Sequence, residues 1–245
     1  MFTFKGNNSD TFLKVLKVRQ SVLPSSKISM VEVAGRSGAY FVKKEHGVRT
    51  IEIEVAIIGA SQTDLRNKVR QIADWLDSEQ PEALTFSDEP DKIYYAILDR
   101  ETDLEEIVSL GTGTLKFTCP DPFAYATNET TLSLVAGGTT EIDLAGTARV
   151  YPVVTATVNT ATNLFRISRG DAFGNDDKLE VSFSFAVGDQ LEVDFMKGTV
   201  KINGTLQMQT LTLDSDFYYL EPKGKNFVWT SGEFTSQMKF SERFK

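Results

Sequence analysis

The side chains that could perform nucleophilic catalysis are few. The chain of 245 residues holds one histidine, His46, and one cysteine, Cys119. A Ser-His-Asp or Cys-His system needs an imidazole base beside its nucleophile, so any such site would depend on His46. His46 lies in the charged segment KKEHGVR, which favours an exposed turn histidine. Cys119 ends an apolar segment that carries no local protease signature, which favours a buried, inert thiol.

Sites for phosphates, metals and glycosidic bonds are not indicated either. GTGTLKF lacks the P-loop lysine and leads into a predicted strand, so we interpret it as a turn. GDAFGNDDK gathers Asp171, Asn175, Asp176 and Asp177, whose oxygens suit calcium, but the EF-hand spacing is absent and a solvated loop is favoured. No motif selects a catalytic pair from the 34 acidic residues. We therefore predict no catalytic residue, no cofactor and no metal site.

An aromatic group near the end of the chain allows two interpretations. It comprises Phe217, Tyr218, Tyr219, Phe227 and Trp229. These rings could form a stacking platform for a sugar, or they could fill the core of a β-sandwich. Alternation within NFVWTSGEF places Phe227 and Trp229 on the same side of a strand, and we interpret that side as the core. The sequence thus predicts a buried Trp229 and a C-terminal module without useful sugar affinity.

Composition limits the remaining classes of function. The chain is 41% hydrophobic, which excludes a disordered tail and allows one or two domains with cores. Its 26 basic and 34 acidic residues give a net charge of −8, which argues against a generally basic nucleic-acid-binding surface. We find no apolar run of transmembrane length and no signal-peptide stretch at the start, so we expect a soluble chain made in the cytosol.

The first part of the chain combines strands with one helix. Apolar residues at positions 51, 53, 55 and 57 alternate with other residues, which predicts a half-buried strand. Ser61 and Thr63 are candidate N-caps for a helix in the segment TDLRNKVRQIADWLDSEQP, and Ser61 and Asp64 have the spacing of a capping box. This helix is predicted to end before Pro81. Its predicted buried face comprises Leu65, Val69, Ile72, Ala73 and Leu76. LTFSDEP, KIYYAIL and GTGTLKFTCPDPFAY are predicted to form further strands.

Everything after the polar stretch ATNETT is strand-like, so we place the boundary there and predict domains at 1–127 and 128–245. Apolar alternation recurs at 179–185, at 191–195 and again at Val200 and Ile202, where a hairpin closes at Asn203-Gly204. Many short strands with one apolar face favour an antiparallel sandwich.

Several segments, in this order, resemble the distal tail protein (Dit) family of long-tailed phages that infect Gram-positive bacteria. They are GRSGAYFVKKEHGVRTIEIEVAIIG, the helix from Thr63 to Leu76, LTFSDEPDKIYYA, FTCPDPFAY and GDQLEVDFMKGTVKINGTLQ. Each is weakly specific by itself, but their order and spacing together cover most of the chain.

This resemblance implies a mainly β structural protein and no enzyme. It implies an N-terminal β-rich domain with one helix that forms a hexameric ring, and a C-terminal galectin-like antiparallel β-sandwich. The ring would join the tail tube to the tail-associated lysin or fibre protein, with receptor-binding proteins and back-to-back rings as further partners. The protein would be made in the host cytoplasm and reside in the virion. DNA would pass through the lumen of the ring without being bound specifically, and the protein would not insert into a membrane. The alternative is a carbohydrate-binding module accessory to a cell-wall hydrolase.

The expected subunit contacts lie in the N-terminal domain. Sheet edges and an arm from Met30 to Val48 offer backbone groups that a neighbouring copy can pair. Gly35 and Gly38 allow a sharp turn, and Arg36 and Tyr40 suit an interface better than a core. Glu52 and Glu54 complete the predicted interface. A mobile surface hairpin without a partner is the alternative for this arm.

Overall fold

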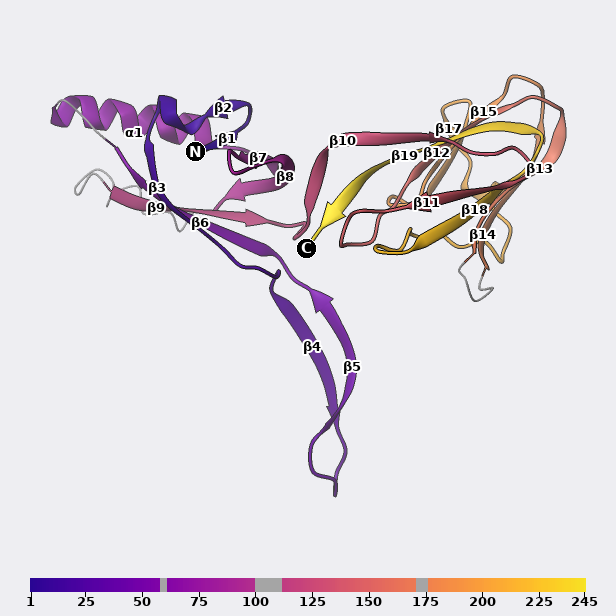
Figure 1. Ribbon diagram of the computed structural model, residues 1–245, viewed down its shortest axis with the longest axis horizontal. Coiled ribbons are helices and arrows are strands. Elements are labelled where there is room, and N and C mark those ends of the chain that lie inside the picture. The colour runs from indigo at the N-terminus through magenta and orange to yellow at the C-terminus, as the bar shows by residue number, and fades with distance from the viewer. Residues whose placement is uncertain (58–60, 100–111, 171–175) are drawn as a thin grey trace. The chain divides into compact units, whose positions relative to one another are not determined.

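The protein has two compact units. The computed structural model describes residues 1–57, 61–99, 112–170 and 176–245. One unit comprises residues 1–127 with Lys245, and the other comprises residues 128–244. The described residues are mainly β, with one α-helix, as the sequence predicts (Figure 1). Among these residues, no helix is long and apolar enough to span a membrane.

The first unit contains two antiparallel ladders that share strand β8. One has the order β2-β1-β7-β8 and the other the order β3-β6-β9-β8. A separate two-stranded hairpin, β4–β5, lies between β3 and β6 in the sequence. The elements are β1 (Phe2–Phe4), β2 (Asn7–Asn8), η1 (Ser9–Thr11), β3 (Lys14–Gln20), β4 (Ser26–Glu32), β5 (Ala39–His46), β6 (Arg49–Ala56), α1 (Gln62–Leu76), β7 (Glu82–Phe86), β8 (Glu89–Leu98), β9 (Thr112–Cys119) and the start of β10 (Ala124–Ser133).

Helix α1 begins with the predicted cap, because the Ser61 hydroxyl accepts a hydrogen bond of 3.2 Å from the Asp64 N–H. Ile72 and Leu76 are fully buried, which confirms the core of the predicted face. Trp75, which the predicted face omits, is also buried. Its indole donates to the Phe4 carbonyl at 2.9 Å and its ring stacks on Phe2 at 5.7 Å. The helix is therefore anchored to β1 by an aromatic contact that strict helical periodicity does not reveal.

The second unit is an antiparallel β-sandwich. One sheet has the order β17-β16-β15-β12-β19-β10, and the other the order β11-β18-β13-β14. The additional elements are β11 (Thr139–Asp143), β12 (Val153–Val158), β13 (Thr162–Gly170), β14 (Asp176–Phe185), β15 (Gln190–Asp194), β16 (Thr199–Ile202), β17 (Thr205–Leu206), η2 (Met208–Thr210), β18 (Lys225–Thr230) and β19 (Phe234–Phe244).

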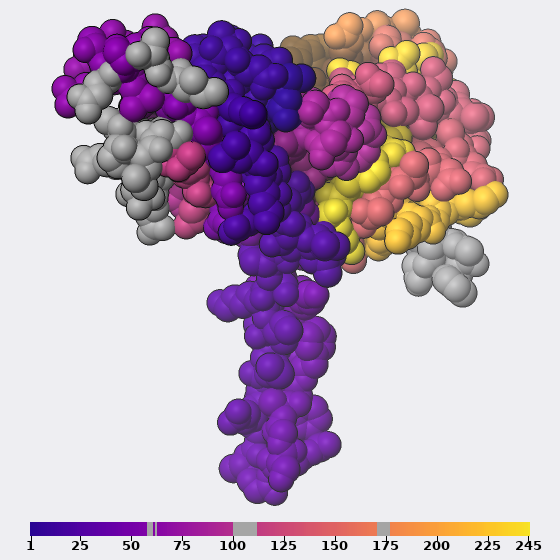
Figure 2. Space-filling model, turned by 60° about the vertical axis from the view of Figure 1, so that its left-hand side comes forward, coloured from indigo at the N-terminus to yellow at the C-terminus, as the bar shows by residue number. Residues whose placement is uncertain are grey.

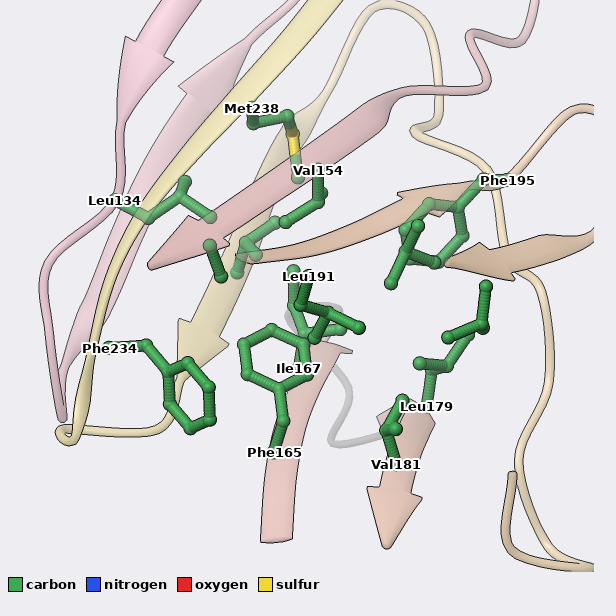
Figure 3. Packing of buried hydrophobic residues seen from close by; sticks show 14 of the residues in the cluster. Leu134, Val154, Phe165, Ile167, Leu179, Val181, Leu191, Phe195, Phe234 and Met238 are labelled. Atoms are coloured by element: carbon green, nitrogen blue, oxygen red, sulfur yellow. The ribbon is translucent and has the colours of Figure 1, made fainter. Parts of the chain in front are cut away.

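The core of the sandwich lies between these two sheets. Figure 3 shows Val154 and Leu191 of one sheet meeting Phe165 and Val181 of the other. All four are buried, so the alternating segments of the sequence do mark inward faces. The predicted hairpin turn also forms, with Asn203 at φ 52° and Gly204 at φ 77°. Positive φ at both central residues is what a type I′ turn requires, which explains the Asn-Gly pair.

Candidate functional site

The most exposed apolar segment of the first unit is the β4–β5 hairpin. Every residue of β5 is exposed, as are all but one of β4. In Figure 1 the hairpin extends away from the other elements of its unit, and Figure 2 shows its side chains uncovered. A fold that serves only its own stability would not leave a strand pair rich in apolar side chains in water.

Its apolar side chains occupy both faces. Met30 pairs across the ladder with Phe41, and Val31 pairs with Tyr40, so consecutive pairs point to opposite faces. Met30 is 60% exposed and Phe41 65% exposed. Val42 is the extra residue of a bulge, because the register passes from Ser29–Lys43 directly to Met30–Phe41. Both faces of this hairpin could therefore be covered by partner surface at once.

Glycines shape the tip, as the sequence predicts. Gly35 has φ 81° and Gly38 has φ 87°, conformations that disfavour any side chain. Between them, the Arg36 N–H donates to the Val33 carbonyl at 3.2 Å, and the Arg36 guanidinium lies 4.6 Å from the centre of the Tyr40 ring. This cation–π contact orders the tip while leaving Tyr40 half exposed.

A buried arginine fixes the root of the hairpin. Arg49 is 2% exposed, and its Nε donates to the Pro122 carbonyl at 2.8 Å while its Nη1 donates to the Ser21 carbonyl at 3.3 Å. The guanidinium also lies 5.6 Å from the centre of the Tyr94 ring. Next to it, the Gly47 N–H donates to the Ser25 carbonyl at 2.8 Å. The hairpin is thus unsupported along its length and held firmly at its base.

The hairpin is locally cationic. Residues 26–46 include four basic and two acidic side chains, an excess of two positive charges in a chain whose net charge is −8. The remainder of the chain consequently carries −10. Lys43 pairs with Glu45 at 2.8 Å, and this hydrogen bond lowers the pKa of the Glu45 carboxyl. The hairpin therefore differs in the sign of its net charge from the remainder of the chain.

The structure separates the six predicted interface residues into two places. Gly35, Arg36, Gly38 and Tyr40 lie at or beside the hairpin tip, whereas the other two lie on β6. Glu52 is in register with Arg19 of β3 and Lys116 of β9, and Glu54 forms a 2.6 Å ion pair with Arg19. The face of β6 that carries Glu52 and Glu54 is therefore surrounded by charges of both signs and is not an acidic strip.

Sequence reasoning missed strand β3 and the apolar residues of β4. In β3 Val15 is half-buried and the other residues are exposed, so the strand shows no buried alternate face. In β5 the signal available was the run Tyr40, Phe41 and Val42, which are aromatic or β-branched residues without a charged residue between them. Such a run predicts a strand, but it does not reveal that the strand's apolar side chains remain uncovered within the subunit.

The remaining predicted positions have ordinary environments. His46 is exposed at the end of β5, with its ring edge-on to Phe123 at 5.5 Å. Partial desolvation, together with the positive charges of Lys245 and Lys44, lowers the pKa of its imidazole. Cys119 is fully buried, which raises the pKa of its thiol to about 12. Residues 171–175 of the acidic loop lie outside the described residues. Within the described parts of the chain, no group of three or more potential metal ligands occurs.

The prediction that Phe227 and Trp229 lie in the core is wrong. They do share one side of β18, but Asn226, Val228 and Thr230 turn inward instead. The inward polar groups are satisfied: the Asn226 amide bonds the backbone of Glu221, and the Thr230 hydroxyl donates to the Val135 carbonyl at 3.0 Å. Both aromatic rings are half-buried on the outer face. Of the other three aromatics, Tyr218 is buried, as predicted.

Comparison with protein families assigns each unit to a known tail module. Residues 6–119 match the phage tail protein RIFT-related domain, and residues 145–244 match the C-terminal domain of the siphovirus-type tail component. The two matched segments follow the division into units described above. Together they define a component of a siphovirus-type phage tail.

Similarity over the full length narrows the family. The distal tail protein of Bacillus phage SPP1 is 26% identical over 242 residues, which cover 98% of this chain and 94% of that protein. The crystal structure of SPP1 Dit, a hub of the adsorption apparatus in phages that infect Gram-positive bacteria, matches with a TM-score of 0.84 at 23% identity, covering 100% and 98% of the two chains. A chain of the activated phage p2 baseplate with Sr matches at 0.50 and 11% identity, over 94% and 90%. The chain belongs to the distal tail protein family of siphovirus-type phage tails.

Proposed function

We propose that this protein forms a hexameric ring that connects the tail tube to the tip apparatus and lets DNA pass through its lumen. The observation that carries this proposal is the β4–β5 hairpin, whose apolar side chains are exposed on both faces. A ring of identical subunits requires a heterologous contact, in which one surface of each copy meets a different surface of the next. The projecting hairpin, with a net charge of +2, and the remainder of the chain, with a net charge of −10, provide two such surfaces.

The proposed interface consists of the hairpin with Gly35, Arg36, Gly38 and Tyr40, and of Glu52 and Glu54 on β6. The hairpin side chains would pack on the neighbouring copy and bury the apolar pairs Met30–Phe41 and Val31–Tyr40. Among the described residues, strand β3 pairs with β6 along one side only, so its other side offers backbone N–H and C=O groups to a neighbour. Strand addition at that edge would give the contact a defined register.

The net charge is consistent with the passage of DNA. Lysine and arginine contacts to phosphates would hold a duplex, whereas a chain at −8 offers few such contacts overall. The proposed partners are the tail tube protein on one side and the tail-associated lysin or fibre protein on the other, with receptor-binding proteins at the periphery and back-to-back rings as a further assembly. The proposed role is structural and not enzymatic, in a protein made in the host cytoplasm and carried in the virion.

Light scattering after size-exclusion chromatography, with electron microscopy of the same fraction, tests the ring. The full chain should elute with the mass of six chains of 27.2 kDa and show rings with a central hole. In a matched variant, residues 27–45 are replaced by Asn-Gly, which closes the ladder at the Ser26–His46 pair with a two-residue turn. This variant should be a folded monomer. A hexamer that persists without the hairpin, or a wild-type chain that stays monomeric at all concentrations, would refute the proposal.

A further inference from the structure

The outer face of the second unit carries a hollow centred on Trp229. Its floor is the β11-β18-β13-β14 sheet, on the side away from the core. It is lined by Thr139, Arg166, Ser168, Gly170, Phe227 and Trp229 and has a volume of about 340 Å³. Pockets for small ligands span roughly 300–1,000 Å³, so this hollow could hold one or two small rings.

The strand register explains why these side chains converge. Trp229 of β18 lies between Thr139 of β11 and Ser168 of β13, which are its cross-strand partners on either side. Phe227 is flanked in the same way by Gly170, which has no side chain to cover the ring. Neighbouring side chains on one face of a sheet lie about 5 Å apart, so a small ligand on Trp229 would reach its flanking residues.

Three polar groups in the hollow have unused hydrogen-bonding capacity. Within the described residues, the Arg166 Nε is buried without a hydrogen-bond partner, since its nearest carboxylate oxygen, on Glu180, is 3.7 Å away. The hydroxyls of Thr139 and Ser168 likewise form no hydrogen bond with the described parts of the chain. The Arg166 guanidinium lies 5.8 Å from the centre of the Trp229 ring. The Arg166 side chain as a whole is 39% exposed, so part of it remains accessible to a ligand in the hollow.

The surrounding charges are balanced, which restricts the ligand. Glu180 also pairs with Lys178 at 3.4 Å, and Glu141 pairs with Lys225. Within the described part of this unit, these pairs leave no excess of positive charge at the hollow to attract a phosphate or a nucleic-acid backbone. The ligand that fits is uncharged, has an apolar face that can stack on an indole, and carries several hydroxyls around its edge.

We propose that this hollow binds a neutral sugar, with the C–H face of one pyranose ring on Trp229 and its hydroxyls at Arg166, Ser168 and Thr139. An aromatic ring with a few convergent polar groups is the usual composition of a small-ligand site. This proposal replaces the expectation of a module without sugar affinity, because that expectation assumed that Trp229 lies in the core. It does not depend on ring formation, since all its residues belong to one unit of one chain.

The two tryptophans provide a sharp test, because Trp75 is buried in the first unit and serves as an internal reference. The full chain is labelled with 5-fluorotryptophan, and its two ¹⁹F resonances are assigned with Trp229→Phe. Titration with methyl β-galactoside, methyl β-glucoside and N-acetylglucosamine should shift the Trp229 resonance saturably for at least one of them, while the Trp75 resonance stays in place. Arg166→Met should weaken this binding at least tenfold, and Trp229→Ala should abolish it in saturation-transfer NMR.

The proposal is overturned if none of the three sugars shifts the Trp229 resonance saturably, or if sugar binding survives Trp229→Ala. It is equally overturned if only glucose 1-phosphate binds, or if only a proline-rich peptide does, because these results would assign the hollow to an anion or to a protein segment. Light scattering on the same samples should give Trp229→Ala the wild-type mass. Failure of the sugar site and failure of the ring are therefore separate results.

Discussion

Replacing Phe41 by serine should weaken assembly without destabilising the subunit. Phe41 is 65% exposed and pairs with Met30 across the hairpin. A phenylalanine side chain buries about 150–250 Å² when fully covered, so a neighbour that covers Phe41 would remove about 100–160 Å² from water. At about 25 cal/mol per Å², this burial contributes about 2.5–4 kcal/mol to each contact between subunits. The substitution should thus weaken each contact by about two to three orders of magnitude.

Folding of the subunit should hardly respond, because an exposed side chain contributes little to the folded monomer. We expect the free energy of unfolding to change by less than about 0.5 kcal/mol. Sedimentation velocity over a concentration series measures assembly, and thermal melting in dilute solution measures folding. Leu213→Ser is the matched control, since Leu213 is fully exposed outside the hairpin. Unchanged assembly of Phe41→Ser, or an equal loss of assembly in Leu213→Ser, would refute the reasoning that the hairpin is the contact.

Three further predictions concern the first unit. Ile72→Ala should lower the free energy of unfolding of this unit by about 2–5 kcal/mol, because Ile72 is fully buried on α1. A melting midpoint that does not move would show that this helix face is not packed. Arg49→Met should lower the free energy of unfolding, measured by chemical denaturation, by about 2–4 kcal/mol, because it removes two hydrogen bonds to backbone carbonyls at the hairpin root. An equally stable variant would mean that these hydrogen bonds do not stabilise the root. Cys119, with a pKa of about 12, should resist thiol reagents at pH 8 until the unit unfolds, and rapid labelling of the native protein would contradict its burial.

Local periodicity predicts the elements that bury one face. Ile51, Ile53 and Val55 are all fully buried on β6, and Ile72 and Leu76 are buried on α1, because in each case the apolar spacing matches the period of the element. The turn at Asn203-Gly204 was also predictable, since few residue pairs adopt two positive φ values. These features depend on residues close together in the sequence, which is why the sequence alone reveals them.

The orientation of β18 could not be derived in this way. Alternation states that Phe227 and Trp229 share a side, but it does not state which side faces the core. Here the inward side carries Asn226 and Thr230, whose polar groups are satisfied by backbone atoms distant in the sequence, such as the Val135 carbonyl. The choice between the two faces is therefore made by long-range partners. An estimate based on side-chain hydrophobicity favours the wrong face.

The exposed hairpin is a different kind of case, because its partner surface is not part of the same subunit. An isolated two-stranded hairpin is marginally stable in water, and here only its root is held, through Arg49 and Gly47. The two units keep their own cores, so Met30 and Phe41 are not needed for the subunit to fold. The side chains of Met30 and Phe41 would then matter for assembly and not for folding. Substitutions along the hairpin should separate folding from ring formation, whereas substitutions at its buried root should affect both.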